Sequence, residues 1–228
     1  MKILIIVAHP DDEVLGMGGT IKKLSKAGNK IKTIFLSTGI LARRPFQTQS
    51  SSKVYTKKFL KQFEKNVREL RRDAKKAAKI LGISEIDFMD FPDNEMDMIS
   101  NLQLTKTIEN EIAKFKPTIV YVPTKYDVNV DHQAVYNSTI TATRPQKDTH
   151  VKQVISFEIP SSTEWYFPSE FSPNIFVDIT KEIRSKTNAL KKYKNEIRKF
   201  PHPRSIDALE AIARRWGSVS GFQYAEAF

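Results

Sequence analysis

The sequence predicts an α/β domain in which a mostly parallel sheet is flanked by helices. The chain opens with a strand-like run at residues 2–8, which is apolar from Ile3 onward. Similar runs recur along the chain with helix-like stretches between them, the pattern typical of right-handed βαβ units. The chain has 228 residues, a length that suits one such domain, so we predict a single domain over residues 1–228.

The first half of the chain is predicted to alternate strand, helix, strand and helix. Residues 2–8 consist mainly of β-branched residues and Leu, as in a strand covered on both faces. A helical pattern runs from about Glu13 to Ala27, and Gly28 is a plausible helix stop. The next predicted elements are a strand at 30–37, a long loop at 38–56 and a helix at 57–81.

The second half continues the alternation. Pro117 separates a helical stretch from the strand-like residues that follow it. The predicted strands are residues 86–89, 118–122, 151–159 and 175–179. The predicted helices are residues 102–115, 132–143, 181–199 and 206–216, and a tail follows at 221–228.

The composition excludes several classes of protein. The chain has no cysteine, which excludes a disulfide scaffold, a Cys-ligated zinc ribbon and a thiol nucleophile. No apolar run approaches the roughly 18 residues of a membrane span, and the opening strand is too short for a secretory signal. We therefore expect a cytoplasmic protein without a membrane span.

The net charge of +11 is the unusual number in the composition. Many of the Lys and Arg residues lie in the stretches 57–79 and 181–199, where acidic and apolar residues are mixed among them. That mixture is typical of solvated amphipathic faces, and no nucleic-acid-binding module is visible. We therefore expect no nucleic-acid partner, whereas a small anionic substrate would suit the charge.

Two polar clusters follow predicted strands. His9-Pro10-Asp11-Asp12-Glu13 comes directly after the first strand, and Asp127-Val128-Asn129-Val130-Asp131-His132 follows the strand at 118–122. In an open α/β sheet, ligands bind outside the carboxyl ends of the strands. We therefore expect the two clusters to meet at one edge of the sheet.

Two His and one Asp could hold a zinc ion with one position open for water. A further carboxylate beside the metal would then act as general base, and the tandem Asp11-Asp12 could supply both a ligand and a base. The other interpretation is that Asp11 or Asp12 only caps the helix that begins near Glu13. From these residues alone, both interpretations stay open.

The two clusters also resemble the motifs of a known family. Ala8-His9-Pro10-Asp11-Asp12-Glu13, followed by Gly16 and Gly18-Gly19, resembles the first motif of the LmbE-like, or PIG-L, zinc-dependent N-deacetylases. Asn129-Val130-Asp131-His132-Gln133-Ala134-Val135 resembles the family's second motif, (His/Asn)-x-Asp-His-x-x-Val. Weaker similarities at 77–82, 91–93 and 224–228 extend the resemblance over nearly the whole chain. It implies a Rossmann-like fold.

The resemblance implies a role for each cluster residue. His9, Asp12 and His132 would be the metal ligands, for Zn²⁺ or alternatively Fe²⁺. Asp11 would be the general base that activates the attacking water and hands its proton to the leaving amine.

The second motif would complete the catalytic group. Many members of the family have His where this chain has Asn129, whose amide could still donate a hydrogen bond to the oxyanion but cannot carry a positive charge. Asp131 would orient a ligand or a neighbour, and it could also serve as the N-cap of the helix that carries His132.

Three residues are candidates for substrate binding. Asp93 matches the acid that contacts substrate hydroxyls in sugar-binding relatives, although an Asp after Pro is also a common turn former. Arg43 and Arg44 lie in the long loop and could meet an anionic substrate, or they could be solvated loop charges.

The glycines of the first motif do not form a dinucleotide-binding fingerprint. Gly16, Gly18 and Gly19 lie inside the predicted helix and lack the G-x-G-x-x-G spacing. We expect them to allow that helix to pack close to the sheet, and we expect no nicotinamide cofactor.

The sequence therefore indicates a zinc-dependent hydrolase that removes acetyl from an N-acetylated amino sugar or sugar conjugate. The expected partner is a small amino-sugar substrate, and a homo-oligomer is compatible with the sequence. The alternative is a catalytically weak or silent member of the same fold that binds metal or sugar.

Overall fold

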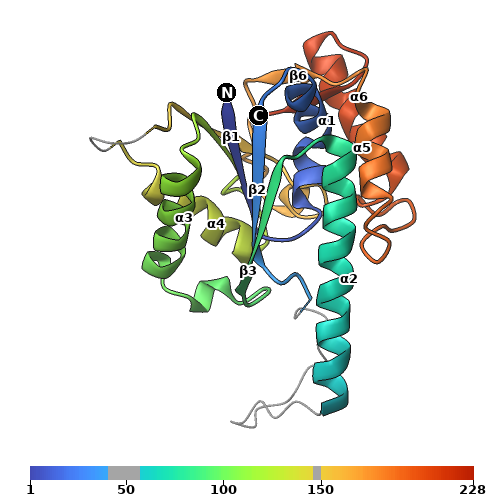
Figure 1. Ribbon diagram of the computed structural model, residues 1–228. Helices are drawn as coiled ribbons and strands as arrows, with labels where there is room; N and C mark the ends of the chain where they lie inside the picture. The colour runs from blue at the N-terminus through green and yellow to red at the C-terminus, as the bar shows by residue number, and fades with distance from the viewer. Residues whose placement is uncertain (41–56, 146–149) are drawn as a thin grey trace.

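The centre of the fold is a five-stranded parallel sheet with the strand order β3-β2-β1-β4-β5 (Figure 1). A computed structural model describes residues 1–40, 57–145 and 150–228. The strands are β1 (Lys2–Val7), β2 (Lys30–Ser37), β3 (Glu85–Phe91), β4 (Ile119–Pro123) and β5 (Gln153–Phe157). The strand order reverses between β1 and β4, and this is where α/β sheets bind ligands.

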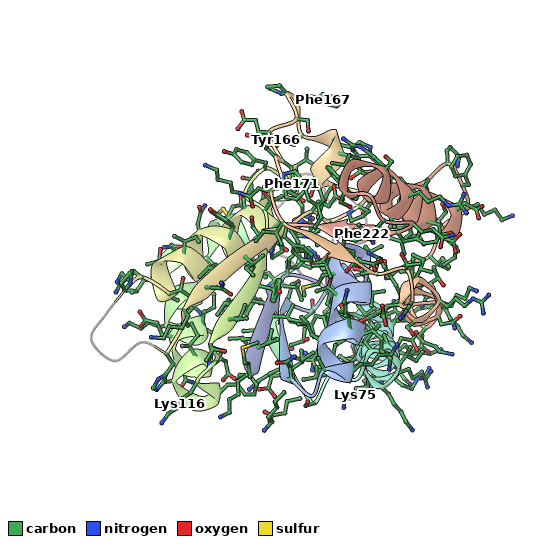
Figure 2. All side chains as sticks on the ribbon, turned by 90° about the horizontal axis from the view of Figure 1, so that it is seen from above. Lys75, Lys116, Tyr166, Phe167, Phe171 and Phe222 are labelled. Carbon is green, nitrogen blue, oxygen red and sulfur yellow. The ribbon has the colours of Figure 1, made fainter. Side chains whose placement is uncertain are left out.

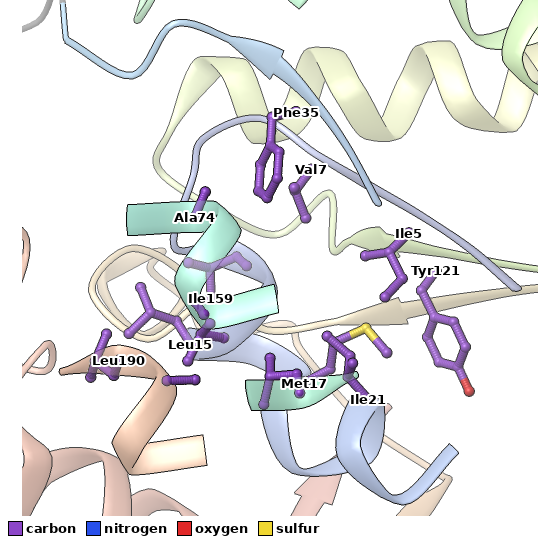
Figure 3. Close-up of a cluster of buried hydrophobic side chains, with 14 of the residues drawn as sticks. Ile5, Val7, Leu15, Met17, Ile21, Phe35, Ala74, Tyr121, Ile159 and Leu190 are labelled. Carbon is purple, nitrogen blue, oxygen red and sulfur yellow. The ribbon is translucent and has the colours of Figure 1, made fainter. Parts of the chain in front are cut away.

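Helices cover both faces of the sheet, as predicted. They are α1 (Asp12–Lys26), α2 (Lys57–Leu81), α3 (Asn101–Phe115), α4 (Val130–Ala142), α5 (Ile183–Leu190) and α6 (Ile206–Ser220). The β1 residues Ile3, Ile5 and Val7 pack in one apolar layer with α1 and α2, part of which is shown in Figure 3. Leu4 and Ile6 pack in the other layer with α3 and α4. Both faces of β1 are thus buried, which explains its unbroken apolar sequence.

The glycines of the first motif permit close packing of α1, as expected. A Cβ at Gly16 would overlap the ring of Phe157, and a Cβ at Gly19 would lie 2.8 Å from the Ile179 side chain. Helix α1 is kinked at Met17, whose φ of −138° is not helical.

Glu226, in the last strand, accepts hydrogen bonds from backbone amides of this kinked helix. The Glu226 carboxylate accepts hydrogen bonds from the amides of Gly19 (2.9 Å) and Thr20 (2.6 Å). The Lys186 Nζ donates to the same carboxylate at 2.6 Å, and both side chains are buried. The last strand therefore helps to hold the helix that begins at the Asp11-Asp12 pair.

Two predicted elements differ in the structure. The strand predicted at 175–179 is β6 (Phe176–Asp178), which pairs antiparallel with β7 (Ala225–Ala227) in a separate two-stranded sheet. The helix predicted at 181–199 is wrong beyond Leu190, where α5 ends. The chain leaves the helical path because Tyr193 turns inward, is fully buried and donates to Glu13 at 2.6 Å.

Much of the positive charge lies on the outside of the molecule. Lys75 on α2 and Lys116 after α3 are exposed, and both are labelled in Figure 2. In the described part of the chain, no helix combines the length and the apolar character needed to cross a bilayer.

Candidate active site

Polar side chains from four loops meet at the carboxyl ends of the parallel strands. The His9–Glu13 cluster follows β1, Asp93 follows β3, the Asp127–His132 cluster follows β4, and residues 159–163 follow β5. The two clusters that the sequence singled out are in direct contact, since His9 Nε2 lies 2.9 Å from Asp131 Oδ2. A hydrogen bond thus joins positions 122 residues apart in the chain.

His9, Asp12 and His132 form a buried group that could hold a metal ion. The distance from His9 Nδ1 to Asp12 Oδ2 is 3.6 Å, from His132 Nε2 to Asp12 Oδ2 3.4 Å, and between the two histidine nitrogens 3.3 Å. A tetrahedral ion with metal–ligand bonds of about 2.0–2.1 Å would separate its ligands by roughly 3.3–3.4 Å. Asp12 Oδ1 is also buried without a hydrogen-bond partner among the described residues. The three residues therefore fit a divalent metal.

Each histidine of this group is also held by a carboxylate on its other nitrogen. His9 Nε2 faces Asp131, and His132 Nδ1 lies 3.0 Å from Asp127 Oδ2. Asp127 in turn accepts from the hydroxyls of Ser162 and Thr163, each at 2.8 Å. Such carboxylate–histidine pairs fix the tautomer and ring orientation of a metal ligand. Both rings are thus oriented with the free nitrogen toward Asp12.

We expect Asp127→Asn to weaken metal binding about 10- to 100-fold, because it removes the charge that orients His132. The dissociation constant for Zn²⁺ would be measured by competition with a chromophoric chelator. Asp97→Asn is the matched control, since Asp97 is exposed. Equal zinc affinity of the Asp127→Asn variant and the unmodified protein would contradict an orienting role.

Strong electrostatic interactions link the buried ligand group. Burial raises the pKa of the Asp12 carboxyl, but the charges and hydrogen bonds of His132 and His9 outweigh burial and hold that pKa far below its usual range. Burial lowers the pKa of His132, but the charge of Asp12 and the hydrogen bonds to Asp12 and Asp127 raise it to about 9. Asp12 is therefore in the carboxylate form that metal binding requires.

Asp11 occupies a strained and buried position beside this group. Its φ of 124° lies in a region that residues other than glycine rarely adopt, and such strain concentrates at functional sites. Asp11 Oδ2 has no hydrogen-bond partner within the described ranges but lies 3.2 Å from Arg204 Nη1. Burial raises the pKa of Asp11 to about 7, although the charge of Arg204 opposes the shift. The Asp11 side chain does not cap α1, because the cap position makes no side-chain hydrogen bond.

A pocket of about 220 Å³ opens in front of Asp11 and His9. Asp93, 3% exposed, lies in its wall with Oδ1 3.0 Å from His9 Nε2. Asn129 also lines the pocket, and its Nδ2 donates to Asn94 Oδ1 at 3.3 Å. Both residues are thus placed where a bound substrate could reach them.

The helix cap at the second motif is Asn129 and not Asp131. Asn129 Oδ1 accepts from the amide of Asp131 at 2.9 Å, so the N-cap interpretation of Asp131 is wrong. Asp131 lies in the first turn of α4, and its carboxylate accepts from the amides of Asn94 (2.7 Å) and Met96 (3.0 Å) besides contacting His9. It therefore ties the loop after β3 to His9, one of the three residues that could hold a metal ion.

Sequence reasoning missed several residues around the pocket. Glu196 and Arg204 both line it, and Arg204 Nη1 lies 3.2 Å from Glu196 Oε2. Neither belongs to a periodic pattern, so no sequence signal marked them. Asp127 was part of a polar cluster but received no role. Arg43 and Arg44 lie outside the described residues.

The pocket and the buried group that could hold a metal ion lie at the switch point of a parallel α/β sheet, where such folds bind ligands. The family model described as "PIG-L: GlcNAc-PI de-N-acetylase" matches residues 4–143, and the chain belongs to this family. Its relatives are named deacetylases, and the protein is accordingly a hydrolase that acts on an amide C–N bond.

Individual relatives match over most of their length. The chain is 28% identical to diacetylchitobiose deacetylase from Thermococcus kodakarensis, over 99% of this chain and 81% of the relative. It is 28% identical to the uncharacterized deacetylase YaiS of Escherichia coli, over 85% of this chain and 90% of the relative. The solved N,N'-diacetylchitobiose deacetylase of Pyrococcus horikoshii is similar in fold, with a TM-score of 0.71, 24% identity, and coverage of 100% of this chain and 82% of that one.

Proposed function

We propose that this protein removes the acetyl group from an N-acetylated amino sugar or sugar conjugate, giving acetate and a free amine. The observation that carries the proposal is the buried His9/Asp12/His132 group with the Asp11 carboxylate beside it, where His9 and Asp11 line a pocket. The relatives named as deacetylases of N-acetylated sugars support this substrate class.

His9, Asp12 and His132 would hold the metal, and their nitrogen and oxygen donors suit Zn²⁺, with Fe²⁺ as the alternative. A divalent ion bound there supplies Lewis acidity, which polarises a carbonyl and acidifies a water molecule. Asp11 would take a proton from the attacking water as the new C–O bond forms. It would then give that proton to the amine nitrogen as the C–N bond breaks.

Other pocket residues would bind the substrate and the developing charge. The Asn129 amide can turn its Nδ2 from Asn94 to an oxyanion, as a neutral donor. Asp93 would accept hydrogen bonds from sugar hydroxyls. Asp131 would position His9 and would not touch the substrate.

Acetate release from a panel of N-acetylated sugars tests this proposal. The panel would include N-acetylglucosamine, N,N'-diacetylchitobiose and an N-acetylglucosaminyl malate, each assayed with protein loaded with Zn²⁺ or Fe²⁺. We expect equal amounts of acetate and free amine from at least one sugar. Zinc binding without acetate release from any sugar would overturn the proposal and indicate a catalytically silent member.

A further inference from the structure

Residues 191–199, directly after α5, carry an unusual group of cations. The five basic residues of this stretch are Lys191, Lys192, Lys194, Arg198 and Lys199, and all five are exposed. None has an acidic partner in the described parts of the chain. We refer to these five residues as the basic rim. A group of like charges without counter-charges favours an anion nearby.

Arg198 is the member of the basic rim that lines the pocket, together with Glu196 and Arg204. The segment is fixed by the buried Tyr193, which donates to Glu13 beside the ligand group. The Arg198 amide donates to the carbonyl of Arg204 at 3.3 Å, so the two arginines are held close together.

The Arg198 guanidinium is itself held in place. Its Nη1 donates to the carbonyls of Asn195 (2.7 Å) and Ile197 (3.1 Å). These bonds use only part of the five-donor fork of an arginine. The remaining donors can bind an oxyanion with two parallel hydrogen bonds, a geometry that arginine offers to carboxylate and phosphate.

The Arg204 guanidinium is less available to bind an oxyanion, because protein groups already contact it. Its Nη1 lies 3.2 Å from both Asp11 and Glu196, and its Nε donates to Ser161 Oγ at 2.8 Å. The positive charge deep in the pocket is therefore matched by carboxylates. An anionic group would find its counter-charge at the rim, at Arg198.

We infer that Arg198 binds a carboxylate or phosphate carried by the substrate on the part of the molecule that extends out of the pocket. The inference rests on the proposed function for the N-acetylated end of that substrate. A pocket of about 220 Å³ is smaller than the roughly 300–1,000 Å³ of sites for drug-sized ligands. A sugar conjugate would thus reach the rim while its acetamide lies near His9 and Asp11. The four lysines would add long-range attraction, which salt screens.

The test compares a neutral and two anionic substrates. The methyl glycoside of N-acetylglucosamine is the neutral one, N-acetylglucosamine 1-phosphate carries a phosphate, and a glycoside with a carboxylate-bearing aglycone completes the set. We expect a higher kcat/KM for at least one of the anionic substrates than for the neutral one. Comparing the phosphate-bearing with the carboxylate-bearing substrate shows which oxyanion the site prefers. In Arg198→Ala the ratio of kcat/KM for the anionic substrate to that for the neutral one should fall about tenfold, through KM.

Arg184→Ala is the matched control, because Arg184 is an exposed arginine on α5 that lines none of the described pockets. It removes the same unit of net charge, so its preference for anionic substrates should equal that of the unmodified protein. Equal loss in both variants would show a general charge effect and overturn the assignment to Arg198.

A binding measurement separates this inference from the proposed function. Calorimetric titration of the chelated protein with N-acetylglucosamine 1-phosphate and with N-acetylglucosamine does not depend on turnover or on a bound metal. We expect tighter binding of the phosphate-bearing sugar, and loss of that difference in Arg198→Ala. Equal affinity for the two sugars, or an unchanged difference in the variant, would overturn the inference even if acetate release is observed. If this difference is seen in a protein that releases no acetate, only the proposed function fails.

Discussion

Asp11→Asn is expected to lower kcat about 100- to 10,000-fold, the usual contribution of a general acid–base group. Asn has nearly the same shape as Asp but cannot accept a proton from water. It also tolerates the positive φ of this position better than most residues, so the backbone should keep its conformation. Activity would be measured as acetate release, with the metal content of the variant determined in parallel.

The controls for this prediction separate catalysis from folding. Arg204 would still have Glu196 as a partner, 3.2 Å away, so the variant should fold. Asp90→Asn removes an exposed carboxylate and should leave kcat unchanged. If Asp11→Asn retains metal and more than about a tenth of the original kcat, then Asp11 is not the base.

Removal of the metal is expected to abolish acetate release, because the Lewis acid and the activated water are lost together. Dialysis against a chelator followed by stoichiometric Zn²⁺ or Fe²⁺ should restore activity. Mg²⁺ should not restore it, since that ion prefers six oxygen ligands and this group offers two nitrogens. Full activity after exhaustive chelation would contradict a metal-dependent mechanism.

The same experiment has a readout that needs no substrate. A ligand present at 100 times its dissociation constant stabilises the folded state by about 2.7 kcal/mol. For a chain of this size that corresponds to a rise in Tm of roughly 5–10 °C. The rise should be lost in Asp12→Asn and retained in Asp97→Asn, whose side chain is exposed. If zinc stabilises Asp12→Asn as much as the unmodified protein, the ions bind elsewhere.

The sheet and the location of the site could be predicted because both depend on local patterns. The unbroken apolar run of β1 indicates burial on both faces, and the structure has apolar layers on both sides of it. The polar clusters end neighbouring parallel strands, and the carboxyl ends of such strands share one edge of the sheet. That is why His9 and Asp131 meet although 122 positions separate them.

The helical prediction at 181–199 failed for a physical reason that local patterns do not carry. The apolar stripe of Ile183, Leu190, Tyr193 and Ile197 has helical spacing, which favours a continuous helix. In the structure, the hydrogen bond between the buried Tyr193 and Glu13 takes the chain off the helical path. A contact between residues 180 positions apart thus outweighs local propensity.

The order of the residues alone was enough to predict the fold class, the strands of the parallel sheet and the two polar clusters, because each arises from neighbours in the chain. Only the tertiary structure decided what surrounds those clusters. Arg204 pairs with Asp11, and Asp127 contacts His132. Glu226 accepts a hydrogen bond from a backbone amide of the kinked helix α1. These contacts depend on how elements pack, and distant partners leave no period or spacing in the sequence. Arg198 is likewise a candidate for substrate binding only because of the tertiary structure, since the chain turns after α5 and Arg198 then lines the pocket.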